Sequence, residues 1–502
     1  MRRLNEILKS ISFRAEGSLD VGVTGVEYDS RKIRKGNVFV CLDGTRTKGS
    51  NFVKDAVEKG ASAVVSGSRP PGLSGGVTFV AVDDTVSALA GLSAAYYRHP
   101  SRRMTLIGVT GTNGKTTVTY LVESIFRTAG IPVSVIGTVN YRIGNRVMPA
   151  GNTTPQSSDL QKLFAMSLNK GIKTAVIEVS SHALALGRVQ LCDFDMAIFT
   201  NLTRDHLDFH GSMDDYFSAK LKLFRMLKVD PSGRREKYAI INRDDPCGSE
   251  IARQTSVPVV SYGFNRKYRV SANNTKMNHK SMSFRIYTKE GSIDIKTVLA
   301  GKHNIYNIMA ACSCAMSYGI KINKIKKGIE RVKVIPGRLE RVDCGQGFAV
   351  FVDYAHTDDA LASVLKTVRE LEPKRVITVF GCGGDRDRSK RPLMGESAVK
   401  LSDYVFVTND NPRTEDPEKI VLDIEVGIRK TGKDNYKVVL DRQEAISSAV
   451  NMADKGDVIL IAGKGHENYQ VLGEKHVSFD DREVARRHIR QRLAGQNTNG
   501  RK

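Results

Sequence analysis

The feature that most constrains this 502-residue chain is an apolar strand that leads into a glycine loop and then into a helix. Met104–Val109 is typical of a buried strand, Thr110–Lys115 carries the glycines, and 116–130 has helical periodicity. A loop in this position wraps a phosphate chain with its backbone amides, and the N-terminus of the helix adds positive potential. The sequence therefore predicts a nucleotide-binding α/β unit around this loop.

The residues of the loop have separate expected roles. Lys115 can reach the β- and γ-phosphates, and the Thr116 hydroxyl can bind Mg²⁺. The strict pattern has a glycine five residues before Gly114, where this chain has Val109, so the loop is a variant. The residues expected to contact ATP here are Gly111, Thr112, Asn113, Gly114, Lys115, Thr116 and Thr117.

Alternating strands and helices extend over the whole chain and predict an α/β fold with three domains. We expect a small α/β unit in 1–103, a central unit with a mostly parallel sheet in 104–336, and a Rossmann-like unit in 337–502. Polar and apolar residues alternate in 268–300, which predicts a small antiparallel piece. The segment 99–104 is interpreted as a linker.

Composition and charge exclude several classes of protein. Hydrophobic residues make up 40%, and no stretch approaches the roughly 18 apolar residues of a membrane span. The basic N-terminus lacks a signal-peptide pattern, and the seven cysteines include no CxxC pair, so we expect a cytoplasmic protein without membrane insertion. The net charge of +23 fits either an anionic partner or a Lys- and Arg-rich surface. Because the charge is spread along the chain and Trp is absent, we expect no nucleic acid partner.

Polar residues follow two further strands. Glu178 ends a buried strand, where a carboxylate can hold Mg²⁺. The Asp- and His-rich loop 200–208 fits either a polar loop over the sheet or a metal site. Lys220 lies on a helix, where a lysine is usually solvated.

Five motifs, in this order, resemble those of the Mur ligases, and the resemblance covers essentially the whole chain. They are TGTNGKTT at 110–117, TNLTRDHLD at 200–208, HNIYN at 303–307, PGRLE at 336–340 and DYAH at 353–356. The resemblance implies that Glu178 and His206 serve a magnesium site together with Thr116. It also implies that Lys220 matches a lysine that these enzymes carbamylate and that then binds a second Mg²⁺.

The resemblance assigns three further residues to the nucleotide. Asn307 would approach the adenine, Arg338 the nucleotide, and Asp353 the ribose. Lys115, Lys220 and His206 are the expected catalytic residues.

The N-terminal unit resembles that of the family member that adds the third peptide residue. By this resemblance a UDP-sugar dipeptide lies between the first two units. Relatives can carry Gln two residues before Arg188, and this chain has Leu186 there, which puts one polar contact in doubt. The residues that match the contacts of this substrate are Ser30, Thr45, Arg46, Thr47, Asn152, Thr153, Thr154, Ser180 and Arg188.

The tetrapeptide DNPR at 410–413 follows a strand and carries the specificity signal. Taken alone it fits a proline turn. Arg413 is suited to a bidentate grip on a carboxylate, and meso-diaminopimelate has a distal carboxylate that lysine lacks. By the resemblance, Glu467 holds the distal ammonium. The expected pocket consists of Arg386, Asp410, Asn411, Pro412, Arg413, Gly463 and Glu467.

The reaction that the resemblance implies uses ATP and Mg²⁺ to add meso-diaminopimelate to UDP-MurNAc-L-Ala-D-Glu through an acyl phosphate, in peptidoglycan synthesis. We expect a monomer. A lysine-adding member of the family is the nearest alternative, and Arg413 argues against it. A folylpolyglutamate synthase is a more distant alternative, which would not need the UDP-type N-terminal unit or DNPR. A nucleic-acid-binding P-loop ATPase is another, and the loops at 152–155 and 410–413 argue against it.

Overall fold

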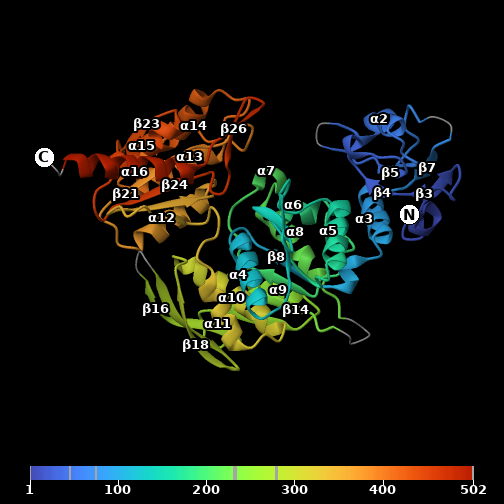
Figure 1. Ribbon diagram of the computed structural model, residues 1–502, viewed down its shortest axis with the longest axis horizontal. Helices are drawn as coiled ribbons and strands as arrows, with labels where there is room; N and C mark the ends of the chain where they lie inside the picture. The colour runs from blue at the N-terminus through green and yellow to red at the C-terminus, as the bar shows by residue number, and fades with distance from the viewer. Residues whose placement is uncertain (1, 45–46, 74–75, 230–234, 278–280, 500–502) are drawn as a thin grey trace.

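The computed structural model describes residues 2–44, 47–73, 76–229, 235–277 and 281–499 (Figure 1). Three sheets follow one another along an elongated molecule, with the N-terminal sheet at one end and the C-terminal sheet at the other. The predicted α/β class with three sheet-containing regions is confirmed. Within the described ranges, no helix is long and apolar enough to cross a membrane.

The N-terminal sheet has five strands in the order β2-β7-β6-β5-β4, and only β2 is antiparallel to its neighbour. Helices α1 (Leu4–Leu8) and α3 (Thr85–Tyr96) cover one face and α2 (Val53–Glu58) the other. A short pair, β1 (Arg2–Arg3) with β3 (Gly22–Val23), lies beside the sheet. The five strands are β2 (Arg14–Glu16), β4 (Gly25–Glu27), β5 (Asn37–Val40), β6 (Ala63–Ser66) and β7 (Thr78–Ala81).

The connection to the next unit, interpreted as a linker, forms a 3-10 helix, Pro100–Arg103.

The central sheet has eleven strands in the order β11-β10-β9-β12-β8-β13-β14-β15-β16-β17-β18. The seven strands from β9 to β16 are parallel, and each edge carries antiparallel strands. The antiparallel piece predicted in 268–300 is confirmed, but it continues the main sheet because β16 pairs with β15. The strands are β8 (Thr105–Thr110), β9 (Ser134–Ile136), β10 (Asn140–Ile143), β11 (Arg146–Pro149), β12 (Thr174–Glu178), β13 (Met196–Phe199), β14 (Tyr238–Asn242), β15 (Val259–Gly263), β16 (Val270–Met277), β17 (Met282–Thr288) and β18 (Gly291–Thr297).

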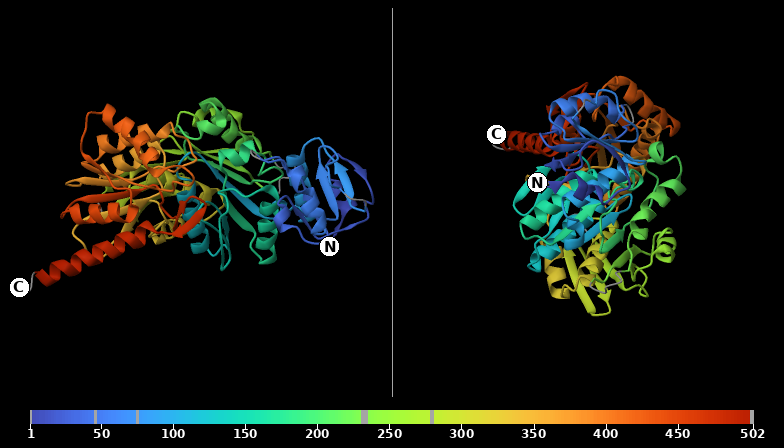
Figure 2. Two further views of the ribbon diagram at one scale, coloured as in Figure 1. Left: turned by 90° about the horizontal axis from the view of Figure 1, so that it is seen from above. Right: turned by 90° about the vertical axis from the view of Figure 1, so that its right-hand side faces the viewer.

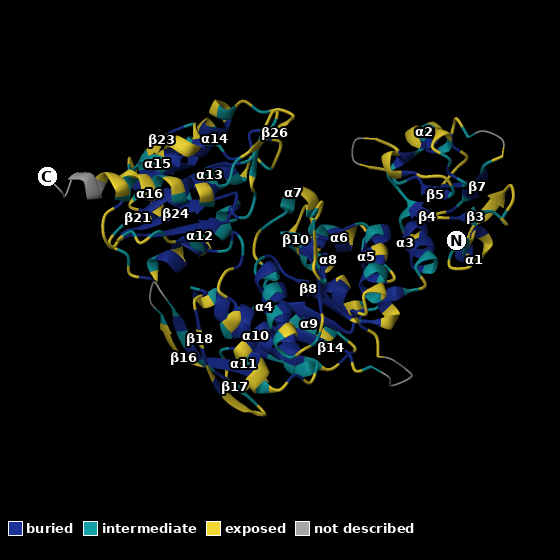
Figure 3. Cartoon of the chain, in the orientation of Figure 1, coloured by how far each residue is buried: buried dark blue, intermediate teal, exposed yellow. Residues whose placement is uncertain are grey.

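Helices cover both faces of the central sheet, and its strands β8, β12 and β13 are therefore buried, whereas the edge strands β11 and β18 are partly exposed (Figure 3). Val118, Leu121, Val122 and Ile125 recur at helical spacing, which turns one side of α4 toward the core. On that face lie α4 (Lys115–Thr128), α10 (Lys302–Ser317) and α11 (Ile322–Arg331); on the other lie α5 (Ser157–Asn169), α6 (Ser181–Ala185), α8 (Met213–Arg225) and α9 (Gly248–Gln254).

The C-terminal sheet has the order β19-β20-β24-β21-β22-β23, and only β19 is antiparallel. Helices α12 (Asp358–Arg369), α13 (Lys390–Leu401) and α14 (Pro417–Lys430) cover one face; α15 (Arg442–Met452) and α16 (Asp481–Asn499) cover the other, and α16 projects from the body (Figure 2). The remaining strands are β19 (Glu340–Val342), β20 (Ala349–Asp353), β21 (Val376–Phe380), β22 (Tyr404–Val407), β23 (Tyr436–Val438), β24 (Val458–Ala462) and the hairpin β25 (Tyr469–Leu472) with β26 (Lys475–Ser478).

Candidate active site

The glycine loop between β8 and α4 contains two positions that only glycine can occupy. Gly111 and Gly114 have φ of 145° and 88°, in the region that favours glycine. A Cβ on Gly111 would lie 1.8 Å from Thr200 Oγ1, and one on Gly114 would lie 2.3 Å from Asn307 Oδ1. The loop therefore packs tightly against the segments that carry Thr200 and Asn307. It lies at the start of α4, and a helix N-terminus is suited to a bound phosphate chain.

Lys115 extends back over this loop. Its Nζ donates to the carbonyl oxygens of Gly111 and Thr112, both at 2.8 Å. Burial lowers the pKa of Lys115, and the nearby carboxylates of Glu178 and Asp205 oppose that shift. Within the described ranges, no carboxylate lies within ion-pair distance of this ammonium. An anionic phosphate would supply the missing partner.

Glu178 is held at the end of β12 with 1% of its surface exposed. Its Oε2 accepts from the hydroxyls of Thr116 at 3.0 Å and Thr138 at 2.9 Å, and its Oε1 accepts from the Thr138 amide at 3.0 Å. The sequence prediction missed Thr138, although its place just after β9 was a usable signal. The described residues contain no group of three or more His, Cys, Asp or Glu that could hold a metal. Thr116 and Glu178 do supply the oxygen ligands that Mg²⁺ prefers.

The loop after β13 is bonded to the glycine loop. Asn201 Oδ1 accepts from the Asn113 amide at 2.9 Å, and Thr200 Oγ1 donates to the Asn113 carbonyl at 2.6 Å. Further along, His206 Nε2 lies 3.4 Å from Asp205 Oδ2, and burial lowers the pKa of His206 to about 3. The imidazole is therefore neutral at physiological pH, the form that binds metal ions.

Lys220 projects from α8 into the interior with 1% of its surface exposed, so it is not the solvated residue that its helix position favours. Its Nζ lies 4.3 Å from the centre of the Tyr216 ring. Burial and the neighbouring Lys115 cation hold the pKa of Lys220 well below its usual value, against the attraction of Asp205. The amine is thus favoured in its neutral, nucleophilic form.

The three residues assigned to the nucleotide differ in their surroundings. Asn307 lies against Gly114, and Arg338 Nη2 lies 3.4 Å from Thr116 Oγ1. Asp353 is buried, with Oδ2 accepting from the Leu339 amide at 2.7 Å and Oδ1 from the Ala355 amide at 2.9 Å. Asn307 and Arg338 therefore face the glycine loop directly, whereas Asp353 anchors the segment that carries Arg338.

The segment expected to hold the sugar-peptide is hydrogen-bonded to the backbone at the end of β12. Thr154 Oγ1 donates to the Glu178 carbonyl at 2.8 Å and accepts from the Ser180 amide at 3.0 Å. Arg188 Nη1 donates to the Thr154 carbonyl at 3.1 Å, and its buried Nε has no partner. In the same segment, Tyr141 Oη donates to the Asn152 carbonyl at 2.5 Å, and Thr153 Oγ1 lies 3.1 Å from Thr138 Oγ1.

The described N-terminal residues assigned to uridine lie outside the strands of the N-terminal sheet. Ser30 is buried at the start of a 3-10 helix, Ser30–Lys32, and its carbonyl accepts from Lys59 Nζ at 3.2 Å. Thr47 is exposed. Thr45 and Arg46 lie outside the described residues.

The DNPR segment follows β22, and its arginine has an unusual backbone. Arg413 has φ of 54°, and its amide donates to the Val471 carbonyl in β25 at 3.1 Å. Its Nη1 donates to the Gly384 carbonyl at 2.6 Å. Burial and the neighbouring Arg386 lower the pKa of Arg413. Two guanidinium groups near one loop form a suitable site for a carboxylate.

The rest of this pocket centres on Asn411. Its Nδ2 donates to Glu467 Oε2 at 3.0 Å, and its Oδ1 accepts from Lys464 Nζ at 3.0 Å. Burial raises the pKa of Glu467, and Lys464 opposes that shift. The fully buried Lys464 was missed by the sequence prediction, although it stands inside the GKGHE segment. A Cβ on Gly463 would lie 2.4 Å from Asp410 Oδ2, so this segment and DNPR are in close contact.

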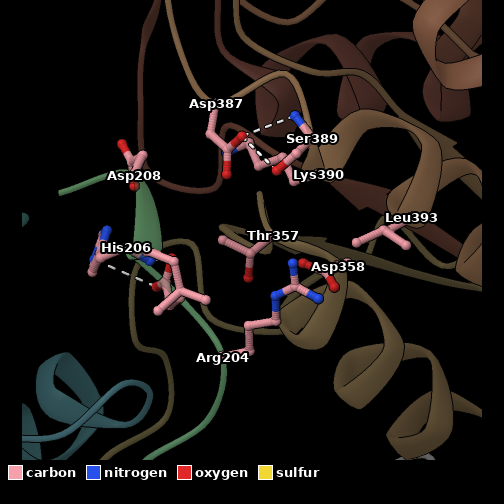
Figure 4. Close-up of a pocket in the computed structure, with 11 residues that line it drawn as sticks. Arg204, His206, Asp208, Thr357, Asp358, Asp387, Ser389, Lys390 and Leu393 are labelled. Carbon is pink, nitrogen blue, oxygen red and sulfur yellow. Dashed lines mark hydrogen bonds and ion pairs between the residues drawn. The ribbon is translucent and has the colours of Figure 1, made fainter. Parts of the chain in front are cut away.

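A cleft of about 270 Å³ separates the loop 204–208 from the C-terminal unit (Figure 4). On the C-terminal side it is lined by 357–358 and by 387–393. Arg204 extends toward Asp358 across the cleft. His206 also lines this cleft, and its ring centre lies 4.7 Å from that of His182 in the central unit.

Three family models match the chain: the Mur ligase family, catalytic domain, over 22–97, the Mur ligase middle domain over 109–315, and the Mur ligase, glutamate ligase domain, over 337–465. A UDP-N-acetylmuramoyl-L-alanyl-D-glutamate–2,6-diaminopimelate ligase of Syntrophomonas wolfei is 45% identical over 492 residues, which cover 98% of this chain and 100% of the relative.

A solved structure with the same enzyme title has a TM-score of 0.68 and 30% identity and covers 98% of this chain and 99% of its own. The MurF ligase of Thermotoga maritima, solved in complex with ADP, has a TM-score of 0.65 and 19% identity, with 94% and 98% covered. These matches define the class of protein as an ATP-dependent ligase that forms an amide bond. The chain belongs to the Mur ligase family.

Proposed function

We propose that this ligase adds meso-diaminopimelate to the D-glutamyl γ-carboxylate of UDP-N-acetylmuramoyl-L-alanyl-D-glutamate, with ATP as the energy-supplying substrate, in peptidoglycan precursor synthesis. The observation that carries the proposal is Arg413. Its hydrogen bonds go to backbone carbonyls, and Arg386 lies beside it. A distal carboxylate could accept hydrogen bonds from both guanidinium groups, and lysine has no such group.

The distal ammonium of diaminopimelate, which shares a carbon with the distal carboxylate, would find a complementary charge in Glu467. This carboxylate is fixed by Asn411 and Lys464, so it can accept from an ammonium group without first being reoriented. Asp410, Pro412 and Gly463 shape the same pocket through close backbone contacts.

We assign the acceptor to the segment around Thr154. Ser180 is the N-cap of α6, and the unpartnered Nε of Arg188 is a donor that a carboxylate of the dipeptide would satisfy. Ser30 and Thr45–Thr47 are assigned to the uridine end. In this division, 1–103 binds the UDP-sugar, 104–336 binds ATP, and 337–502 binds the amino acid.

The proposed chemistry has two steps. A γ-carboxylate oxygen of the acceptor attacks the γ-phosphorus of ATP and ADP leaves, which gives an acyl phosphate. The amine of diaminopimelate then attacks the acyl carbon, loses a proton, and phosphate leaves. Lys115 stabilises the charge on the transferring oxygens, and Thr116, Glu178 and His206 would hold Mg²⁺, which supplies further charge neutralisation when bound.

We propose that Lys220 is carbamylated. Its neutral amine attacks the carbon of CO₂ and loses a proton, and the product is a carbamate with carboxylate-like oxygens that can hold a second metal ion. The support is the full burial of the amine and its lowered pKa, because only an unprotonated amine can make this bond. We further propose a cytoplasmic monomer.

Phosphate release tests the function directly. ATP, Mg²⁺ and UDP-MurNAc-L-Ala-D-Glu are combined with either meso-diaminopimelate or L-lysine. We expect release with diaminopimelate, and a loss of kcat/KM on the order of 10²–10³-fold in R413A. The matched control is R388Q, because Arg388 is an exposed arginine near this loop that pairs with Glu415. Release with lysine alone would overturn the pocket assignment.

A further inference from the structure

A cavity of about 400 Å³ lies on the flank of α4, the helix that begins at the glycine loop. Its volume falls within the roughly 300–1,000 Å³ of small-molecule sites. None of the residues that line it has a role in the active site described above. They are Tyr120, Glu123, Ser124 and Arg127 of α4, Arg142 of β10, and Arg331, Val332, Lys333 and Val334 at and after the end of α11.

The lining of this cavity has more positive than negative charge. It contains four cationic side chains and one carboxylate, Glu123. Glu123 is already engaged, because Arg142 Nε donates to it at 3.0 Å and Arg127 Nη2 lies 3.0 Å from its Oε1. The only acidic group that lines the cavity therefore has little capacity to neutralise the other cations.

Two of these cations lack a counter-charge. Arg331 has no carboxylate within ion-pair distance in the part of the chain that the structure describes, and Lys333 Nζ donates to the Glu330 carbonyl at 2.9 Å. The Glu330 carboxylate is used elsewhere, since Oε1 accepts from the Lys296 amide at 3.0 Å. Arg331 and Lys333 are both exposed, so they present free donors at the rim.

The wall beside these cations combines an exposed apolar side chain with a cation–π pair. Val334 is 51% exposed, and the guanidinium of Arg142 lies 4.1 Å from the centre of the Tyr120 ring. A ligand with a negative group at the rim and a less polar body would satisfy both parts of the cavity.

A structural role accounts for part of this charge. Arg127 and Arg331 lie in the last turns of α4 and α11, where cations balance the helix dipole. That role does not explain Lys333, which lies beyond the helix, or the cavity between the two helix ends. Segment 321–333 as a whole carries six Lys and Arg and a single Glu, so the local charge exceeds what one helix end requires.

We propose that this cavity is a second anion site, separate from the ATP site, that binds the phosphate group of a small molecule through Arg331 and Lys333. Arg127 completes the cationic rim, and Val334 with the Arg142–Tyr120 pair contacts the body of the ligand. Guanidinium groups suit phosphate because their N–H donors match its oxygens in pairs. The site lies on α4, the helix that begins at Lys115. The proposal of a second anion site holds whichever amino acid the ligase adds.

Calorimetric titration with inorganic pyrophosphate in magnesium-free buffer tests the proposal on the full chain. The wild type is expected to show two binding events, one at the glycine loop and one here. R331Q/K333Q should lose one event, with affinity at that site weakened about tenfold or more. The matched control is K324Q/K327Q, which removes the same charge from exposed positions of α11 outside the cavity.

A second variant, V334E, guards against misfolding of the first. It retains all the cations and places a carboxylate at an exposed rim position, and it should lose the same binding event. A single binding event in the wild type would overturn the proposal. So would equal losses in the control, or a loss of stability in R331Q/K333Q with pyrophosphate binding unchanged, which would leave Arg331 with its helix-end role alone.

Discussion

Two pairs of cations, of which Lys115 is partly buried and the other three are buried, differ in the groups that surround them. Lys115 and Lys220, in the central unit, have no carboxylate within ion-pair distance among the described residues. Arg391 and Arg442, in the C-terminal unit, are both fully buried and both paired with carboxylates. We call the first pair the ligand-side lysines and the second the core arginines.

Both core arginines are paired with carboxylates, although the buried Nε of Arg391 has no hydrogen-bond partner among the described residues. Arg442 Nε and Nη2 each lie 2.8 Å from an oxygen of Asp481, and both side chains are 0% exposed. Arg391 bonds to Glu415 through Nη2 at 2.9 Å and to Asp423 through Nη1 at 2.9 Å. These contacts join α13 to α14 and α15 to α16.

This difference helps to distinguish cations that stabilise the fold from cations that take part in the reaction. A buried charge is costly unless it is paired, so an unpaired cation persists only where a ligand or a modification compensates it. The lowered pKa values of the ligand-side lysines show this cost, whereas the core arginines have raised pKa values because their carboxylates outweigh burial. Substitutions in the two pairs should therefore have opposite signatures.

The largest expected effect on stability is at Arg442. R442M leaves Asp481 buried without its counter-charge, and we expect a loss of about 3–5 kcal/mol in the free energy of unfolding. Chemical denaturation followed by circular dichroism measures it. The double variant R442M/D481L should recover much of the loss. An R442M variant as stable as the wild type would contradict the structural role assigned to Arg442.

Lys220 should behave in the opposite way. K220M removes an unpaired buried amine, so the free energy of unfolding should stay unchanged or rise, while phosphate release falls on the order of 10²–10³-fold. Denaturation and the release assay on one preparation give both numbers. A variant that is destabilised like R442M but retains activity would place Lys220 among the structural cations.

Acid should weaken the pairing of the core arginines. Hydrogen bonding from Arg391 lowers the pKa of Glu415 to about 2, below its usual 4.5. Its contribution is therefore complete above about pH 4.5 and is lost as the pH falls toward 2. We expect E415Q to be less stable than the wild type by about 1–3 kcal/mol at pH 7, and this gap to shrink between pH 4.5 and 2. A gap that is constant with pH would contradict the assignment.

The smallest effect is expected beside Arg188, a partly buried cation with no carboxylate within ion-pair distance in the described part of the chain. Leu186 is 41% exposed two residues before it. L186Q should lower the KM for the UDP-sugar dipeptide by about 2- to 10-fold through one added hydrogen bond, with kcat little changed. L186M is the control for side-chain shape. Equal KM values for the two variants would show that position 186 makes no polar contact with the substrate.

Much of the fold could be predicted because its signals are local. Apolar runs such as 376–380 and 458–462, bounded by turn residues, correspond to β21 and β24. The sequence did not indicate the β10–β11 hairpin or the joining of 270–297 to the main sheet. Those features depend on strand pairing between distant segments, which residue patterns alone do not specify.

The candidate site divides in the same way. Gly111, Gly114 and Lys115 stand in one short motif, and their local geometry follows from it. Thr138 and Lys464 were missed because their roles arise from contacts with Glu178 and Asn411, each some 40 or more residues away. No local sequence pattern indicates the buried pair of Arg442 with Asp481, because Asp481 belongs to another helix.

The central claim is that the ligand-side lysines have no carboxylate partner among the described residues because a ligand or a modification compensates their charge. Lys220 tests this claim most directly. Protein equilibrated with ¹³C-labelled bicarbonate is examined by ¹³C NMR, with K220M as the reference. The account predicts one carbamate resonance in the wild type that is missing from K220M. Identical spectra for the two proteins would contradict it, because the buried amine would then carry no modification that compensates its burial.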